Sequence, residues 1–95
     1  MFEKLKQFKD LRSKAKEIQS TLATEKVEGL GGWNKVKIEM DGNQNVTSVS
    51  IADDILGDKA KIQDGVREAV NDAVKKAQRK MMEKMKDMGA LPGVS

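Results

Sequence analysis

The spacing of apolar residues changes twice along the chain, and each change marks a change of secondary structure. Over about the first 24 residues apolar side chains recur every three or four positions, the period of an amphipathic helix. The period then falls to two, and Val36, Ile38 and Met40 alternate with charged residues, as in a strand with one buried face. The helical period returns later and lasts almost to the end. The pattern predicts a helix over residues 2–24, a sheet within 26–52 and a second helix over 58–88.

The middle of the chain predicts an antiparallel sheet. The turn sequence Asp41-Gly42-Asn43 separates the first alternating run from a second one, Val46 to Ile51, so the two runs form a hairpin. Two strands alone are marginally stable, and a short edge strand at Val27-Glu28 would complete a three-stranded meander. The sequence Gly29-Leu30-Gly31-Gly32 is predicted to be a tight turn or bulge, because it lacks the following Gly-Lys-Ser/Thr of a P-loop. The fold class is therefore α+β.

Both predicted helices carry an apolar stripe. In the first helix the stripe consists of Phe8, Leu11, Ala15, Ile18 and Leu22. In the second helix it consists of Val66, Val70, Ala73, Ala77, Met81 and Met88. A helix of thirty residues is about 45 Å long, which exceeds what a small globule needs. Part of the second helix therefore projects or packs against a partner, and residues 89–95 are expected to form a mobile tail.

The composition excludes several classes of protein. The chain has 95 residues, enough for one domain, and contains no Cys, His or Tyr. Disulfides, the usual general base and most transition-metal sites are therefore absent from it. We predict no catalytic residue, no metal site and no cofactor, and we expect oligomerisation to supply extra buried surface. No signal peptide or membrane span is recognisable, so we expect a cytoplasmic protein that does not bind membranes.

Charge is distributed unevenly along the chain. Residues 1–20 carry six bases and three acids, residues 73–95 carry six bases and two acids, and the middle carries ten acids and six bases. Two basic ends flanking an acidic centre suggest a polyanionic partner such as nucleic acid. The alternative is that these bases only solubilise two surface helices.

Phosphate contact is the chemistry that the basic ends suggest. Within the second helix, Lys75, Arg79 and Lys86 lie opposite the apolar stripe. No aromatic residues are interleaved with the bases, which argues against stacking on single-stranded bases. We therefore expect contacts to duplex DNA dominated by backbone charge. The predicted DNA-binding residues are Lys6, Lys9, Arg12, Lys16, Lys75, Lys76, Arg79, Lys80 and Lys86.

A second set of residues is predicted to bury surface in a dimer. Trp33 is out of phase with the alternating strand, so it follows a bulge or lies on the other face of the sheet, and Val46 is the second candidate for an apolar patch there. Met81 and Met85 belong to a methionine cluster that either fills a packing seam or binds a protein partner adaptably. That second option supports the alternative function, a protein-interaction or chaperone-like scaffold.

The order of these segments resembles the YbaB/EbfC nucleoid-associated protein family. The resemblance rests on Val36-Lys37-Ile38-Glu39-Met40-Asp41-Gly42, Val46-Thr47-Ser48-Val49-Ser50-Ile51 and Ala69-Val70-Asn71-Asp72-Ala73, followed by a Met-rich helix end and Leu91-Pro92-Gly93. It covers residues 2–93. The departures are Trp33, where the family usually has an aliphatic residue, and short termini.

The resemblance implies an α-β-β-β-α protomer and a homodimer joined through its sheet regions, with helices projecting like the arms of tweezers. It also implies a cytoplasmic, nucleoid-associated protein that binds DNA with little or modest sequence preference. It implies no enzymatic activity.

Overall fold

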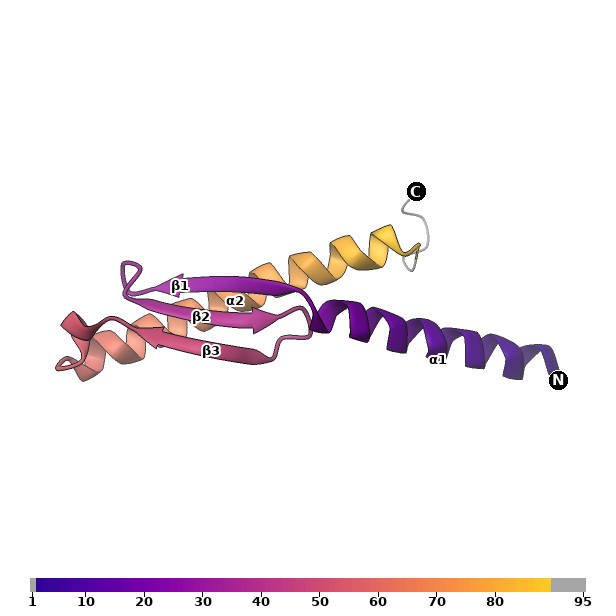
Figure 1. The fold of residues 1–95 in the computed structure, drawn as a ribbon, viewed down its shortest axis with the longest axis horizontal. Coiled ribbons are helices and arrows are strands. Elements are labelled where there is room, and N and C mark those ends of the chain that lie inside the picture. Colours follow the sequence, from indigo (N-terminus) through magenta and orange to yellow (C-terminus); the bar gives the residue numbers. More distant parts are fainter. Residues whose placement is uncertain (1, 90–95) are drawn as a thin grey trace.

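The computed structural model describes the backbone of residues 2–89 and the side chains of residues 10–89. A long helix is followed by three strands and a second long helix, so the predicted α+β order is confirmed (Figure 1). The elements are α1 (Phe2–Ala23), β1 (Lys26–Gly31), β2 (Val36–Asp41), β3 (Val46–Ile51), the short 3-10 helix η1 (Asp53–Ile55) and α2 (Lys59–Asp87). The predicted tail beyond residue 89 lies outside the described residues.

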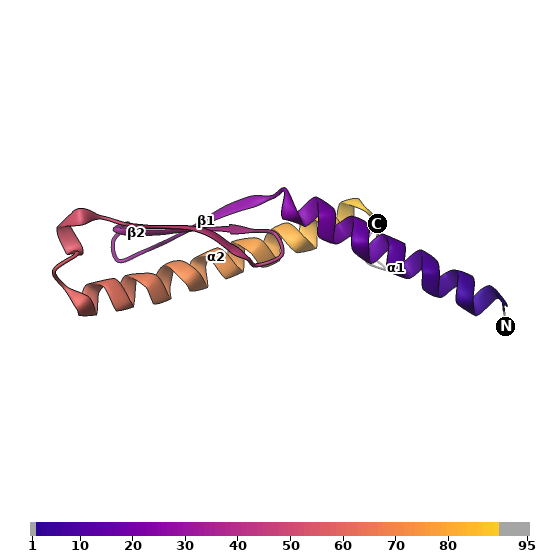
Figure 2. The ribbon, with the colours of Figure 1, turned by 60° about the horizontal axis from the view of Figure 1, so that its bottom comes forward.

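The sheet is an antiparallel meander with the order β1-β2-β3, and α2 forms a second layer on one face (Figure 2). α2 packs mainly on β1 and β2 and leaves β3 largely uncovered. Both helices extend past the same end of the sheet and diverge there (Figure 1), which gives the chain an extent of 63 × 23 × 18 Å. The expectation that a helix projects from the globule is met by α1 as well as by the end of α2.

The alternation in β2 has the expected cause. Val36, Ile38 and Met40 are buried against α2, while the residues between them are only half-buried. On α2 the buried line is Gly65, Ala69, Ala73 and Ala77, spaced four residues apart, and Val66 and Val70 flank it half-buried. The two valines of the predicted stripe therefore lie to one side of the line of residues that packs on the sheet. Small residues rather than large ones face the sheet.

The glycine-rich segment is not the tight turn that we predicted. Gly29 and Gly31 lie inside β1, directly against the small residues of α2. A Cβ added at Gly29 would lie 2.0 Å from the Ala69 carbonyl oxygen, and one at Gly31 would lie 2.2 Å from that of Gly65. These glycines bring the strand and the helix backbones together, so β1 is longer than the edge strand expected at Val27-Glu28.

The turn between β1 and β2 follows these two glycines. Gly32, Trp33 and Asn34 all have left-handed backbone conformations, with φ of 59°, 59° and 66°. We predicted that Trp33 follows a bulge or lies on the second face of the sheet. Both alternatives are wrong, because Trp33 belongs to the turn. Its side chain is 96% exposed at the tip of the turn.

The turn between β2 and β3 holds the end of α1. The Asp41 carboxylate accepts the backbone N–H groups of Asn43 and Asn45, each at 2.9 Å, and this bonding, chiefly with Asn45, lowers the pKa of Asp41 below its usual value. The Gly42 N–H donates to the Leu22 carbonyl at 2.9 Å, and Leu22 is buried. α1 is thus anchored at its last turn, while residues 10–17 are exposed.

Candidate nucleic-acid interface

The basic residues of α2 form two rows with different surroundings. Lys75, Arg79 and Lys86 form the outer row: they are exposed, and no ion pair joins them to any side chain that the structure describes. They lie within one side of the helix, because their positions along a 3.6-residue period differ by only about 40°. This row is the part of the predicted DNA-binding set that stays available to phosphate.

The inner row consists of Lys76, Lys80 and Lys84, which are half-buried and already bonded to the protein. Lys84 Nζ lies 3.0 Å from a Glu25 carboxylate oxygen, and Lys80 Nζ lies 4.0 Å from the other oxygen. The pKa of Lys84 is raised, chiefly by its hydrogen bond to Glu25. Two of our predicted DNA-binding residues, Lys76 and Lys80, are therefore partly neutralised within the chain.

α1 supplies a second basic surface. Arg12, Lys14 and Lys16 are exposed on the part of α1 that extends away from the sheet. Lys6 and Lys9, also predicted to bind DNA, lie outside the residues whose side chains are described. Lys14 was not in our predicted set, because two residues of helix place it on the side of α1 away from Arg12 and Lys16.

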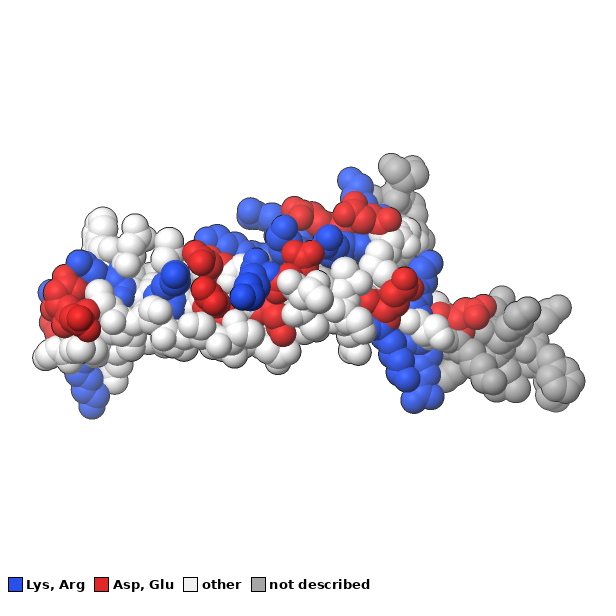
Figure 3. Space-filling view, in the orientation of Figure 1, with Lys and Arg blue, Asp and Glu red and all other residues white. Residues whose placement is uncertain are grey.

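Figure 3 shows basic groups over the outer half of α2, where acidic groups lie among them, and on α1. It also shows an acidic group at the opposite end of the molecule, around η1, with basic groups beside it. Asp53, Asp54 and Asp58 make up this acidic group in the sequence. The exposed bases at the end where the helices diverge are therefore the surface that would attract a polyanion.

Three side chains of α2 cover the free edge of β1. Asp72 accepts the Leu30 N–H at 3.0 Å, Glu68 accepts the Gly32 N–H at 2.8 Å, and Lys76 Nζ donates to the Glu28 carbonyl at 2.7 Å. Lys76 also pairs with Asp72 at 3.0 Å. The periodicity of the sequence did not reveal this clasp, although the three residues follow one another at steps of four beside the buried line of α2.

The clasp predicts a pH-dependent stability. Hydrogen bonding to Leu30, followed by Lys76, lowers the pKa of Asp72, so its stabilisation is present above the unfolded pKa near 3.9 and is lost as the pH falls through the folded pKa. Asp72→Ala should lower the free energy of unfolding by about 1 kcal/mol at pH 7, a value reduced for the partial exposure of the carboxylate. Urea titrations of the wild type and the variant should converge as the pH falls below the folded pKa of Asp72.

Asp64→Ala provides the matched control for this measurement. Asp64 is exposed on the same helix and makes only a helical ion pair with Arg67 at 3.6 Å. Its removal should change stability less than the removal of Asp72. An equal loss in the two variants at pH 7 would contradict a specific role of the clasp.

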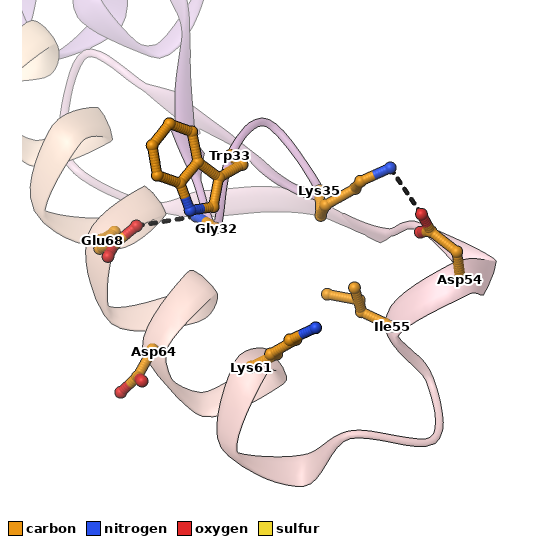
Figure 4. Close-up of a pocket in the computed structure, with 8 residues that line it drawn as sticks. All are labelled: Gly32, Trp33, Lys35, Asp54, Ile55, Lys61, Asp64 and Glu68. Atoms are coloured by element: carbon orange, nitrogen blue, oxygen red, sulfur yellow. Dashed lines mark hydrogen bonds and ion pairs between the residues drawn. The ribbon is translucent and has the colours of Figure 1, made fainter.

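A hollow of about 350 Å³ lies beside the turn that carries Trp33 (Figure 4). Its charged groups are already engaged: Lys35 pairs with Asp54 at 2.6 Å, and this bond lowers the pKa of Asp54. Glu68, also in its wall, is held by the Gly32 N–H. Nothing in this hollow resembles a catalytic arrangement, and among residues 10–89 no group of three acidic side chains is placed to hold a metal ion.

The predicted dimer residues are dispersed. Val46 is 50% exposed on β3, Trp33 is at the opposite end of the sheet, and Met81 and Met85 are half-buried near the end of α2. The structure does not bring these four into one patch within a single chain. Within the described part of the chain, no helix has the length and apolar character needed to cross a membrane.

Comparisons with known proteins agree with this architecture. The family model described as the YbaB/EbfC DNA-binding family matches residues 1–91. The crystal structure of an uncharacterized protein, HP0035 from Helicobacter pylori, is similar with a TM-score of 0.77 at 19% sequence identity, over 93% of this chain and 96% of that one. This likeness shows the fold. No curated protein matches the chain.

Proposed function

This chain belongs to the YbaB/EbfC DNA-binding family, and from that premise we propose that it binds duplex DNA mainly through phosphate contacts made by its two helices. Nucleoid-associated DNA binding fits the family, which is not a family of enzymes. The contacts, their location and the low or modest sequence preference are our proposal. So is a location in the cytoplasm, at the nucleoid.

The outer row of α2 is the observation that carries this proposal. Lys75, Arg79 and Lys86 are exposed on one side of a helix whose opposite side is occupied by the sheet. Lysine and arginine without an acidic partner contribute most to phosphate binding, because no internal ion pair has to be broken first. Arg12 and Lys16 of α1 would add contacts at the same end of the molecule.

We further propose that the protein acts as a homodimer, so that two pairs of diverging helices present basic surface to one duplex. Two linked weak sites bind more tightly than either site alone, since the second contact is intramolecular. No aromatic side chain accompanies the outer row on α2, which favours contact with the DNA backbone over reading of single-stranded bases.

A salt titration tests the proposed function. Binding of the purified protein to several unrelated duplexes should weaken steeply with added salt, and the logarithm of affinity should fall linearly with the logarithm of salt concentration by about 0.9 for each phosphate contacted. The slope should be nearly the same for all duplexes. Affinity that is independent of salt, or confined to a single sequence, would contradict the proposal.

Failure to bind any duplex at low salt would favour the alternative function, a scaffold for a protein partner. Met82 is exposed near the end of α2, and a flexible, polarisable side chain of this kind suits an adaptable protein interface. In that case the basic residues would only keep the helices soluble.

A further inference from the structure

An ionic link joins α2 to the segment that follows α1. Glu25 lies between the end of α1 and the start of β1, and its carboxylate reaches across to α2. One carboxylate oxygen lies 3.0 Å from Lys84 Nζ, and the other lies 4.0 Å from Lys80 Nζ. No other ion pair among the described side chains connects α2 to the end of α1. The link is therefore placed where the two helices separate.

This link is also the most sheltered ion pair in the described part of the chain. The Glu25 side chain is 22% exposed and that of Lys84 is 33% exposed, whereas the acids of the other pairs are 37% to 63% exposed. Shelter from water and salt reduces the screening that makes most surface ion pairs weak. The backbone of Glu25 is held as well, because its N–H donates to the Leu22 carbonyl at 3.1 Å. The carboxylate therefore holds α2 from a fixed point on the chain.

The other hydrogen bonds at the last turn of α1 lead to the turn between β2 and β3. Besides the bond from Gly42 to Leu22, the Asn43 side-chain amide donates to the Gln19 carbonyl at 2.9 Å. These bonds hold the end of α1, but neither of them connects it to α2. The direction of α1 relative to α2 therefore depends on the link through Glu25 as well.

A small rotation at the last turn of α1 produces a large movement of the basic residues on that helix. Arg12 lies ten residues before Leu22, which corresponds to about 15 Å along a helix. A rotation of about 10° would move Arg12 by about 3 Å, enough to break a charge-assisted hydrogen bond of about 2.8 Å. The position of Arg12 and Lys16 relative to the outer row of α2 is therefore sensitive to the link through Glu25.

We propose that Glu25 is a positioning residue for DNA binding. By holding Lys84 and Lys80, it fixes the angle between α1 and α2, so that the basic residues of both helices meet one duplex together. This inference rests on the proposed function and names a residue that acts on DNA binding without contacting DNA. A fixed angle favours binding, because α1 does not have to be ordered when the duplex binds and the second contact becomes intramolecular.

Nitroxide labels on the two helices test the link in the absence of DNA. The chain has no cysteine, and Ser13 of α1 and Gln78 of α2 are exposed and uncharged, so Ser13→Cys with Gln78→Cys allows both helices to be labelled. Electron paramagnetic resonance gives the distribution of distances between the labels. Dilution with unlabelled protein restricts the signal to labels within one chain. Glu25→Gln in this background should widen the distribution, because α1 is then free to rotate about its last turn.

Glu83→Gln is the matched control for the label measurement. Glu83 is exposed on α2 directly before Lys84, and it makes no ion pair with a described side chain. Its replacement removes the same charge and should leave the distribution unchanged. Circular dichroism checks that each variant is folded. A distribution in Glu25→Gln that equals the wild-type distribution, or an equal widening in both variants, would overturn the proposal.

An exchange of the two charges tests the consequence for DNA binding. Glu25→Lys and Lys84→Glu each place like charges at the link, whereas the double variant restores opposite charges and the net charge of the wild type. Long-range effects of the two charges on affinity should add in the double variant. Restoration of the link should make the double variant bind duplex DNA at least about threefold more tightly than the sum of the single effects predicts.

The outcomes separate this inference from the proposed function. A wild-type protein that binds duplexes, combined with additive effects in the exchange variants, would overturn the role of Glu25 and leave the proposed function in place. A wild-type protein that binds no duplex would overturn both the proposed function and the role of Glu25 in it. A widened label distribution in Glu25→Gln together with recovery in the double variant is the result that we expect.

Discussion

Replacing Lys75, Arg79 and Lys86 together with glutamate should weaken binding to every duplex by a similar factor of at least several hundred in about 0.1 M salt. Each phosphate contact contributes about 0.9 to the slope of log affinity against log salt. Three lost contacts in one chain therefore remove about 2.7 orders of magnitude of the affinity that is gained between 1 M and 0.1 M salt. The slope should decrease by about 2.7 for each chain that contacts the duplex. Because these side chains are exposed and face away from the sheet, the melting temperature should change little.

The matched control places the same change of charge at the other end of the molecule. Lys59, Lys61 and Arg67 are exposed bases near η1, and their replacement with glutamate alters the net charge by the same amount. Affinity should fall much less, through long-range repulsion alone, and the salt slope should stay close to that of the wild type. Equal losses in both triple variants would mean that net charge, not contact with the outer row of α2, controls binding.

The second basic surface can be separated from the first in the same assay. Arg12→Glu with Lys16→Glu should reduce the slope by about 1.8 for each chain whose α1 also contacts phosphate. An unchanged slope in this double variant, together with the expected loss in the α2 variant, would restrict the DNA site to α2.

Periodicity predicted those features of the chain that depend on one side of an element being buried. Val36, Ile38 and Met40 alternate with polar residues because only one face of β2 meets α2. The outer row of α2 could be predicted for the same reason, because a helix with one packed side must expose the residues on the other side. In both elements the period of the sequence and the period of the backbone coincide.

Periodicity could not predict which bases are neutralised. Lys80 and Lys84 follow the same spacing as exposed bases, but they meet Glu25, which lies more than fifty residues earlier and approaches only because β1 runs beside α2. Lys76 is engaged for the same reason, by the carbonyl of Glu28. Contacts between distant segments depend on strand order and register, which a single helix pattern does not contain.

The glycines of β1 show a second limit of the sequence. A glycine has no side chain with which to show the alternation of a strand, so Gly29 and Gly31 looked like a turn. Their role became evident only beside Gly65, Ala69 and Ala73 of α2, where small residues face each other across the seam. The sequence contains both spacings, two residues between the glycines of the strand and four between the small residues of the helix. It does not show that these residues face each other.

Gly29→Ala should consequently destabilise the fold more than any other substitution discussed here, by about 3 kcal/mol. The new Cβ would lie 2.0 Å from the Ala69 carbonyl oxygen and 2.5 Å from the Ala73 backbone nitrogen, and neither backbone atom can rotate away. α2 must therefore move outward from β1, which stretches the clasp formed by Glu68 and Asp72 and opens the core beside Ile38. Urea unfolding at pH 7 gives the free energy directly.

Gly57→Ala is the control for the intrinsic effect of replacing glycine with alanine. A Cβ at Gly57 has no neighbouring atom within 4 Å, so this variant should be neutral or slightly more stable, by up to about 1 kcal/mol, through the reduced entropy of its unfolded chain. If Gly29→Ala were as stable as Gly57→Ala, the close approach of β1 and α2 would be wrong. The position of the clasp residues on the β1 edge would then need revision.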